Sequence, residues 1–570
     1  MQPPALYYEP SGYVESTSVS ASKGPGPAGL MGRQVAGREF LNAYLQHGSW
    51  SELVALTAGV SAKEELSRFC IDHPSSAQRQ RRLKTIAAAD FHSQFLVDPP
   101  ASVLHFPNPA DPSYAWARQR RPHALAFSGV THTLCSQRAV EVLRGLVTDP
   151  WEPYDRLICT SRAVQRMVTT IVSNFSDYLK DRFGGDPKPR IQLETIPLGV
   201  DTQRFHPATS EERRIARQRF RIQSDEIAVL FVGRLSHHAK AHPFPMFHAC
   251  QQAARRSGKS LRLLMCGWAP SEAVASAFCQ AGAAIAPEVK IEFPDGMDRR
   301  IRSEVWHAAD VFISLVDNIQ ETFGLVLVEA MASGLPVIAT DWNGYRDLVV
   351  EGQTGSLIPT HIVPDAIPEL TSQLLTGAIN YDHFLARASQ TVTVDLHSAA
   401  DALTRLCEDS SLRRQYAAAG RKRAEECFDW RHVIARYESM WQQQEQQLAE
   451  VRACSKGGPS FEAPAAYPPL ETSFSGYPTS WFDRQQRLRV ADGAEEQLDR
   501  LLELPLMTHE ATMRCSDAAV MKKLLQHSDE SKTLATWERQ FQAAMPEPKC
   551  RPTIAWLIKY GLLIPVDAID

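Results

Sequence analysis

The chain lacks any run of about eighteen apolar residues, which excludes an ordinary membrane-spanning helix. Its first residues, Met1 to Tyr8, contain no basic segment ahead of an apolar stretch and so do not resemble a signal peptide. None of the eleven cysteines belongs to a C-x-x-C pair, which predicts reduced thiols. These absences favour a cytoplasmic location and leave a peripheral membrane contact open.

The chain also lacks an excess of either charge. It has 61 Lys and Arg against 65 Asp and Glu, a net charge of -4, which gives no reason to expect a nucleic-acid partner. With 570 residues, 44% of them hydrophobic, the chain is long enough for more than two domains with real cores.

One segment near the middle reads as a βαβ unit of a parallel sheet. The apolar run 310–315 predicts a strand, residues 323–333 predict a buried helix that stops at Gly334, and 337–340 predict a second strand. Ligands of such sheets bind at the carboxyl ends of the strands. The loop 318–322 is therefore a candidate binding loop.

Two acids, Glu321 and Glu329, flank the predicted helix start. If both lay on one helix, eight residues would separate them by about 12 Å, comparable to the length of a nucleoside diphosphate sugar. The amides of Thr322, Phe323, Gly324 and Leu325 would suit a phosphate oxygen. The alternative is structural: Glu321 would complement the helix dipole and Glu329 would be a solvated helix position.

The run 321–341, ETFGLVLVEAMASGLPVIATD, resembles the E-x7-E signature of retaining GT-B glycosyltransferases of family GT4, with the strand that follows it. The run 231–235, FVGRL, with Lys240 resembles a further motif of that family. A third motif of the family is similar to the run 196–205, IPLGVDTQRF, in which Leu198 stands where Asn is usual.

The resemblance assigns roles to these residues. It implies that Glu321 contacts the donor sugar, that Glu329 contacts the ribose, and that Arg234 and Lys240 neutralise the diphosphate. Residue chemistry agrees, because Gly233 ends an apolar strand and places Arg234 where a guanidinium can form paired hydrogen bonds to phosphate. The alternative is that Arg234 and Lys240 are ordinary surface bases.

The loop after Arg234 departs from the family pattern. Residues 241–245, AHPFP, stand where the family has Gly after the Lys, so the path of loop 236–245 is open. His237, His238 and His242 lie close enough in sequence to suggest a metal site. No Asp, Glu or Cys joins them, which disfavours that reading.

The first lobe resembles the family less closely. Gly29, Gly32 and Arg33 follow a predicted strand at 5–8 and precede a helical pattern, as in the glycine-rich loop that approaches the donor phosphates or the acceptor. A flexible surface loop is an equal alternative.

His132 follows a strand predicted at 123–127, on the ligand-binding edge of the sheet. By resemblance it would face the donor sugar. A lone histidine is more often a core or surface hydrogen-bonding residue.

The predicted fold is α/β: a GT-B arrangement of two Rossmann-like lobes facing a cleft, with a small, mainly helical C-terminal domain. The predicted boundaries are 1–200 for the acceptor-side lobe, 201–433 for the nucleotide-sugar lobe, 434–453 for a crossover helix, 454–480 for a linker, and 481–570 for a helical accessory domain. We expect the accessory domain to bind a protein partner or to mediate self-association.

The resemblance implies transfer of a sugar from a nucleotide sugar, most simply a UDP- or GDP-sugar, to a hydroxyl acceptor with retention and without a metal or a further cofactor. The acceptor class, whether glycan, lipid-linked, small molecule or protein, stays open. Two alternatives are a catalytically silent nucleotide-sugar-binding scaffold and a GT-B glycan phosphorylase, which would need a covalently held pyridoxal phosphate.

Overall fold

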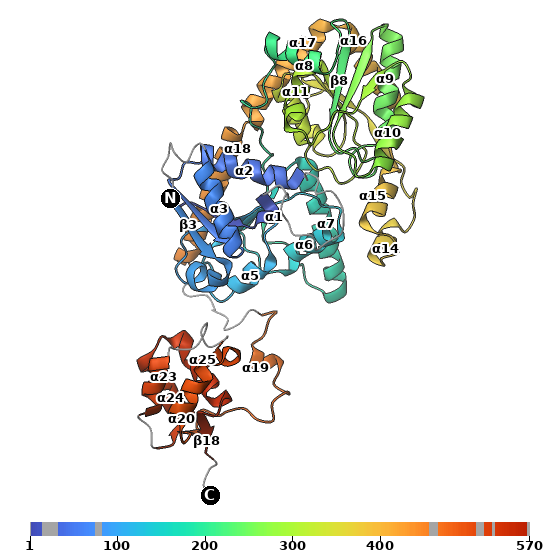
Figure 1. The fold of residues 1–570 in the computed structure, drawn as a ribbon. Coiled ribbons are helices and arrows are strands. Elements are labelled where there is room, and N and C mark those ends of the chain that lie inside the picture. The colour runs from blue at the N-terminus through green and yellow to red at the C-terminus, as the bar shows by residue number, and fades with distance from the viewer. Residues whose placement is uncertain are drawn as a thin grey trace. The chain divides into compact units, whose positions relative to one another are not determined.

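The computed structural model describes residues 2–13, 32–73, 82–454, 465–508, 518–526 and 530–566. The chain divides into two compact units, residues 1–467 and 468–570. In Figure 1 the first unit contains two sheet-and-helix lobes, drawn blue to cyan and green to yellow. No helix in the described ranges is both long and apolar enough to cross a membrane.

The first lobe is built on seven parallel strands in the order β3-β2-β1-β4-β5-β6-β7. The strands are β1 Ala5–Tyr8, β2 Glu52–Thr57, β3 Arg82–Ala87, β4 Val103–Phe106, β5 Ala126–Val130, β6 Arg156–Cys159 and β7 Gln192–Thr195. The chain runs outward from β1 to β3 on one side of the sheet and then continues from β4 on the other side. In parallel sheets of this kind, ligands bind at the carboxyl ends of the strands where the order reverses, here β1 and β4.

The helical elements of this lobe connect successive strands and include two short non-α segments. They are α1 Pro10–Tyr13, α2 Gly32–His47, α3 Val60–Asp72, η1 Ala88–Asp90, η2 Phe91–Leu96, α5 Pro112–Arg118, α6 Gln137–Thr148 and α7 Arg162–Phe183. Ser161 begins α7 as an N-cap, because its hydroxyl accepts a hydrogen bond from the Val164 amide at 3.2 Å.

The second lobe repeats the same topology with six parallel strands, β10-β9-β8-β11-β12-β13. They are β8 Ile227–Val232, β9 Leu261–Cys266, β10 Lys290–Glu292, β11 Val311–Ser314, β12 Val337–Thr340 and β13 Gly355–Ile358. The helices are α8 Ser210–Arg219, α9 Phe244–Ser257, α10 Glu272–Ile285, α11 Arg299–Ala308, α12 Leu325–Ala332 and α13 Tyr345–Leu348.

An excursion of residues 359–395 leaves this sheet after β13. It holds an antiparallel pair, β14 Thr360–Ile362 with β15 Val392–Val394, and two helices, α14 Leu370–Leu375 and α15 Tyr381–Ser389. The chain then returns to the lobe through α16 Leu396–Glu408, α17 Ser410–Arg423 and η3 Ala424–Phe428.

The long helix α18, Trp430–Cys454, carries the chain back onto the first lobe. Its Trp441 Nε1 donates to Ser128 Oγ at 3.1 Å, and Gln444 Nε2 donates to two first-lobe carbonyls. The helix begins inside the range predicted for the second lobe, so it includes the predicted crossover segment and a turn before it.

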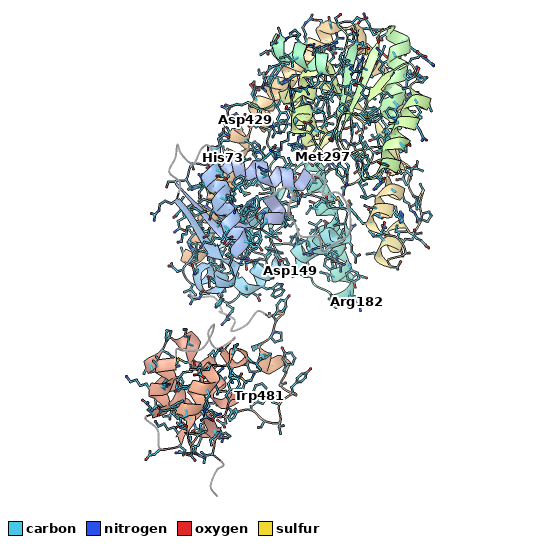
Figure 2. All side chains as sticks on the ribbon, viewed as in Figure 1. His73, Asp149, Arg182, Met297, Asp429 and Trp481 are labelled. Carbon is cyan, nitrogen blue, oxygen red and sulfur yellow. The ribbon has the colours of Figure 1, made fainter. Side chains whose placement is uncertain are left out.

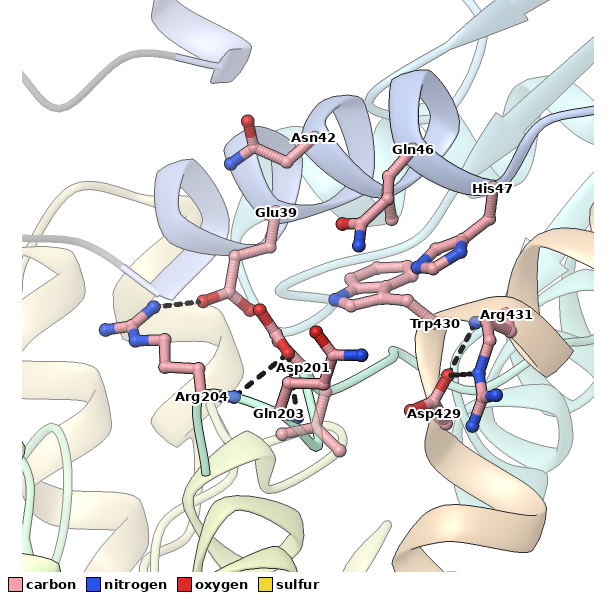
Figure 3. Close-up of a pocket in the computed structure, with 12 residues that line it drawn as sticks. Glu39, Asn42, Gln46, His47, Asp201, Gln203, Arg204, Asp429, Trp430 and Arg431 are labelled. Carbon is pink, nitrogen blue, oxygen red and sulfur yellow. Dashed lines mark hydrogen bonds and ion pairs between the residues drawn. The ribbon is translucent and has the colours of Figure 1, made fainter. Parts of the chain in front are cut away.

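The two chain crossings between the lobes lie side by side. Val200 pairs with Asp429, a residue labelled in Figure 2. Gly199 packs on Trp430 so closely that an added Cβ would lie 2.3 Å from the indole ring. Figure 3 shows the small pocket between this crossing and α2, lined by Trp430, Asp429 and Glu39 among others. Close packing at this point fixes where the two lobes meet.

The C-terminal unit has a core of its own around Trp537, Phe541 and Leu557. A three-stranded antiparallel sheet, β17-β16-β18, accompanies its helices. The elements are α19 Leu470–Ser473, β16 Arg487–Val490, α20 Ala494–Leu502, α21 Pro505–Thr508, α23 Ala518–Gln526, β17 Lys532–Thr533, α24 Leu534–Ala544, α25 Glu547–Lys559 and β18 Leu563–Pro565.

The predicted α/β class with two Rossmann-like lobes and a mainly helical C-terminal unit is confirmed. One strand differs in position: β5 covers residues 126–130, three residues later than the predicted 123–127. His123 has φ 64°, a left-handed conformation that a strand cannot contain. Periodicity alone does not show such a turn.

Candidate functional site

A cavity of about 890 Å³ lies between the two lobes of the first unit, and most of the predicted site residues line it. Those that do are His132, Gly233, Arg234, Lys240, Glu321, Thr322, Phe323, Gly324, Leu325 and Glu329. They come from the carboxyl ends of β5, β8 and β11 and from α12, which is the edge where parallel sheets bind ligands. The cavity has the size of a site for a cofactor or a small molecule.

Glu321 and Lys240 form an ion pair in this cavity. Lys240 Nζ lies 2.6 Å from Glu321 Oε2, and both side chains are largely buried. Burial by itself would raise the pKa of Glu321, but the Lys240 ammonium and the amides of Phe323 and Thr322 together outweigh it and hold that pKa below its ordinary value. For Lys240, burial opposes the charge, yet Glu321 raises its pKa. Both groups are therefore charged near neutral pH.

The other oxygen of Glu321, Oε1, accepts from the amides of Thr322 at 3.2 Å and Phe323 at 3.4 Å. These are two of the amides expected to hold a phosphate, so the carboxylate stands where an anion was predicted. The Asn343 side chain donates to the Glu321 carbonyl at 2.8 Å and fixes the loop from the other side. The loop thus presents a set of anion-binding amides, with Glu321 as their partner in the structure.

The helix that follows begins later than predicted. α12 runs from Leu325 to Ala332, after Gly324 in a left-handed conformation with φ 103°. A Cβ at Gly324 would lie 2.3 Å from the ring of Tyr345, so only glycine fits there. Glu321 therefore lies in a loop outside the helix, and the predicted helical spacing of about 12 Å to Glu329 does not apply.

Arg234 follows β8 as predicted, and its side chain lines the cavity. Its Nη2 lies 3.4 Å from the carbonyl of Ala239 and 3.5 Å from Gln320 Oε1. Burial lowers the pKa of Arg234, but a guanidinium keeps its charge. The Lys240 side chain packs closely on Gly233, because a Cβ added at Gly233 would lie 3.0 Å from it. The two bases thus lie on one side of the cavity.

At another part of the cavity, Glu329 lies on α12 near a second carboxylate, Glu39 of α2. Burial raises the pKa of Glu329 to about 7 and that of Glu39 to about 8, and the charge of Glu329 contributes to the shift at Glu39. Arg204 Nη1 lies 3.2 Å from Glu39 Oε1, the contact dashed in Figure 3. Arg204 and Arg302 both oppose the shift at Glu329.

Sequence reasoning missed Glu39, Arg204 and Arg302 as cavity residues. Arg204 lies within the interdomain run that resembled the family, but at a position its motif leaves free. Glu39 lies on α2, far away in sequence, and nothing in the helical pattern distinguishes it from a solvated glutamate. Only the packing of the two lobes brings these groups together.

His132 lines the cavity from the first lobe. Its Nε2 lies 2.7 Å from the carbonyl oxygen of Pro107. A carbonyl can only accept, so Nε2 carries the proton and the ring is held by the neighbouring loop. His132 therefore has a fixed orientation, which suits a positioning role.

Three predicted residues are placed less completely. Gly29 lies outside the described residues. Gly32 and Arg33 begin α2, but the side chain of Arg33 lies outside the described part of the chain. A role for these residues in phosphate or acceptor binding stays a prediction.

Loop 236–245 forms a tight turn before α9. The amides of Lys240 and Ala241 both donate to the carbonyl of Ser236, and the amide of His242 donates to Asp317 Oδ1 at 3.2 Å. In the described ranges, the ligand atoms of the three loop histidines do not gather into a metal-binding group. The turn places the Lys240 side chain next to Gly233.

Comparisons with known proteins agree with this geometry. Residues 212–391, which contain β8 to α15, match the sequence profile of the family described as "Glycosyl transferases group 1". The second lobe is similar to this family over the matched residues. The matched segment contains Arg234, Lys240, Glu321 and Glu329.

Curated proteins that are similar to part of this chain carry the name D-inositol 3-phosphate glycosyltransferase. The protein of Rhodococcus opacus is 30% identical over 248 residues, 42% of this chain and 52% of the relative. That of Geodermatophilus obscurus is 32% identical over 236 residues, 40% of this chain and 49% of the relative. The chain spans about half the length of the curated relatives it matches.

Among solved structures, Anabaena HepE in complex with UDP is similar with a TM-score of 0.46 and 15% identity, covering 80% of this chain and 100% of that one. Sucrose-phosphate synthase from Thermosynechococcus elongatus is similar with a TM-score of 0.44 and 19% identity, over 80% of this chain and 100% of that one.

Proposed function

We propose that this protein is a cytoplasmic, metal-independent, retaining glycosyltransferase that moves a sugar from a UDP- or GDP-sugar to a hydroxyl acceptor. The observation that carries the proposal is one interlobe cavity lined by two cations, Arg234 and Lys240, and two carboxylates, Glu321 and Glu329. That set of charges matches a ligand with an anionic centre and hydroxyl groups on both sides of it. A nucleotide sugar has this chemistry.

The donor diphosphate would lie against Arg234, Lys240 and the amides of Thr322 and Phe323. It would compete with Glu321 for Lys240 and for both amides, because the carboxylate uses all three in the structure. Glu321 would then turn to accept hydrogen bonds from the sugar hydroxyls. Donor binding thereby exchanges one internal ion pair for two interactions with the ligand.

Glu329 would accept hydrogen bonds from the ribose diol, for which its ionised form is the better acceptor. Its pKa of about 7 places that ionisation near neutral pH, with burial as the largest cause. His132, fixed by Pro107, would orient a sugar hydroxyl from the first-lobe side. Glu321, Glu329 and His132 would thus hold the two ends of the donor.

The reaction breaks the bond between the anomeric carbon and a diphosphate oxygen and forms a bond from the acceptor oxygen to the same face of that carbon. The acceptor's proton passes to the leaving phosphate oxygen. Arg234 and Lys240 stabilise the negative charge that grows on the leaving group, a role of preorganised electrostatics. The proposed mechanism uses no carboxylate nucleophile.

A thermal-shift panel of UDP-, GDP-, ADP- and dTDP-sugars tests donor binding, since a ligand that binds the folded state raises the melting temperature. We expect a shift with a UDP- or GDP-sugar, followed by transfer to a polyol or glycan acceptor. The relatives' name makes a phosphorylated inositol a sensible first acceptor. Binding without transfer or hydrolysis across acceptor classes would indicate a nucleotide-sugar-binding scaffold, and no shift with any donor would contradict the proposal.

A further inference from the structure

A second group of side chains with its own chemistry lies at the edge of the second lobe. His206 precedes α8, Glu212 lies in the first turn of α8, and His307 lies in the last turn of α11. One ligand atom from each lies within 4.8 Å of the other two. His206 Nε2 is 3.8 Å from Glu212 Oε1, and the two imidazole rings are 5.1 Å apart between centroids.

The remaining polar atoms of His206 and Glu212 are already used. His206 Nδ1 lies 3.1 Å from the carbonyl of Pro207, which can only accept, so Nδ1 carries the proton. In the neutral ring the lone pair is thereby on Nε2, the atom that faces Glu212. Glu212 Oε2 accepts from the Thr209 amide at 2.8 Å in a capping box, which leaves Oε1 on the side of the histidines. Such outer contacts orient metal ligands.

The helices that carry these ligands are held rigidly together. Arg213 and Arg217 of α8 both pair with Asp310, just beyond α11, at 2.6 and 3.0 Å. The ring of Trp306, next to His307, packs edge-on against Phe205, next to His206, at 5.8 Å. The ligand set therefore stands on fixed elements and not on a loose surface.

We propose that His206, Glu212 and His307 form a binding site for Zn²⁺ or a similar divalent transition metal. Two imidazoles and one carboxylate are a ligand set that Zn²⁺ prefers, at bonds of about 2.0 to 2.2 Å. Tetrahedral ligands at such bonds lie about 3.4 Å apart. His206 Nε2 and Glu212 Oε1 are 3.8 Å apart, and all three ligand atoms lie within 4.8 Å of one another. Side-chain movements of roughly an ångström would bring these atoms to the spacing of tetrahedral ligands.

Three protein ligands leave a coordination position open, as in zinc sites that bind water or a further ligand. Both histidines line the interlobe cavity, so an exogenous oxygen could reach that position from the cavity. The metal would also tie residue 206, which follows the crossing between the lobes, to α11. The site shares the cavity with the proposed donor site, but its three ligands have no role in the proposed transfer reaction, so the proposal does not depend on that reaction.

Cobalt is a direct probe, because Co²⁺ in a tetrahedral site absorbs visible light. We expect tag-free, chelator-treated full-length protein to bind one Co²⁺ per chain at this site, with Zn²⁺ displacing it. His206→Ala, His307→Ala and Glu212→Gln should each weaken binding at least tenfold, since even the loss of an outer contact to a metal ligand typically costs that much. The glutamine keeps an oxygen for the Thr209 amide, so the helix cap survives in that variant.

His237→Ala and His242→Ala serve as matched controls, since they remove neighbouring histidines of another loop. Both should bind Co²⁺ as the wild type does. Circular dichroism of every variant establishes that the fold is kept. The proposal is overturned if the wild type shows no saturable binding, if folded His206→Ala, His307→Ala and Glu212→Gln variants bind as tightly as the wild type, or if the loop-histidine variants lose the metal instead.

Discussion

At the scale of single residues, the pair Lys240–Glu321 determines the electrostatics of the cavity. Each is charged because the other is near, and the exposed fractions of their side chains are 18% and 16%. Removing one partner leaves an uncompensated charge in a site of low dielectric, whereas removing both leaves none. The pair is therefore a test of how the site is preorganised.

We expect Lys240→Met to lower the free energy of unfolding by about 3 kcal/mol, since a nearly buried Glu321 loses its partner. The double variant Lys240→Met/Glu321→Gln should recover part of that loss. Glu321 has a depressed pKa, so the stabilisation is present above the unfolded pKa near 4.5 and is lost as pH falls below it. Urea unfolding at pH 7 and pH 4 measures both effects, and additive losses in the double variant would contradict the coupling.

The raised pKa of Glu39 gives the free energy of unfolding a pH dependence opposite to that from Glu321. Its pKa of about 8 exceeds the unfolded value, so the folded state keeps a proton that the unfolded chain has lost between about pH 4.5 and 8. Wild-type stability from this group falls as pH rises through that window. Glu39→Gln removes this pH-dependent loss of stability, because glutamine does not titrate.

We expect the stability of Glu39→Gln relative to the wild type to increase from pH 5 to pH 8 by about 4 kcal/mol. Each pH unit between the unfolded and the folded pKa contributes about 1.4 kcal/mol, and about three such units lie in this window. Chemical unfolding at pH 5, 6.5 and 8 measures the difference. A difference that stays constant over this range would show that Glu39 is not held protonated.

At the scale of elements, the sequence predicted where strands end better than where helices and loops begin. The buried runs of β8, β9, β11 and β12 are continuous stretches of apolar residues, typical of parallel strands covered on both faces. The start of α12 depends on the left-handed Gly324 and its contact with Tyr345. Such a contact is tertiary, so local periodicity cannot report it.

The excursion at residues 359–395 is another element that the sequence did not indicate. Its Tyr381 hydroxyl lies 3.1 Å from Cys135 Sγ of the first lobe and 3.4 Å from Gln320 Nε2 beside Glu321. Leu385 packs in a small apolar cluster with Cys135 and Ala239. The excursion thus touches both lobes at the edge of the predicted donor loop.

We expect Tyr381→Phe to raise the donor KM about threefold to tenfold with a smaller change in kcat, because two hydrogen bonds that position Gln320 and the lobes are lost. Tyr178→Phe, at an exposed tyrosine of α7, is the matched control and should behave as the wild type does. Steady-state kinetics with the donor varied gives the answer. An unchanged donor KM in Tyr381→Phe would show that the excursion does not help to position the donor.

At the scale of the whole molecule, the chain contains two separately packed units. The cores of the two lobes lie within residues 1–467, and the core around Trp537 belongs to residues 468–570. The boundary falls inside the segment predicted as a linker from its Pro, Ser and Gly content. A fragment that ends at Tyr467 keeps every described residue that lines the interlobe cavity.

We expect the fragment 1–467 to fold and to show the same thermal shift with the preferred donor as the full chain. Each unit buries its own apolar residues, so neither needs the other to form a core. Differential scanning fluorimetry of both proteins makes the comparison. A fragment that is soluble and folded yet fails to bind the donor would place part of the donor site in the C-terminal unit.

The sequence predicted the cavity residues of the second lobe because they lie in short motifs at strand ends. It did not predict the Glu39–Arg204 contact or the His206, Glu212 and His307 group. Their members come from separate segments, and each is an ordinary residue in its own helix or loop. The packing of the two lobes brings Glu39 and Arg204 together, and the packing of α8 on α11 brings His206, Glu212 and His307 together.

In the proposed reaction, Glu321 holds the donor sugar for transfer. The most direct test is the rate at which nucleotide is released from the preferred sugar donor in the presence of an acceptor. Glu321→Gln should reduce that rate at least a hundredfold while melting as a folded protein, because a charged partner of the sugar is lost at the reacting centre. Glu64→Gln, at an exposed position of α3, should match the wild type. Wild-type turnover in a folded Glu321→Gln variant would contradict the account.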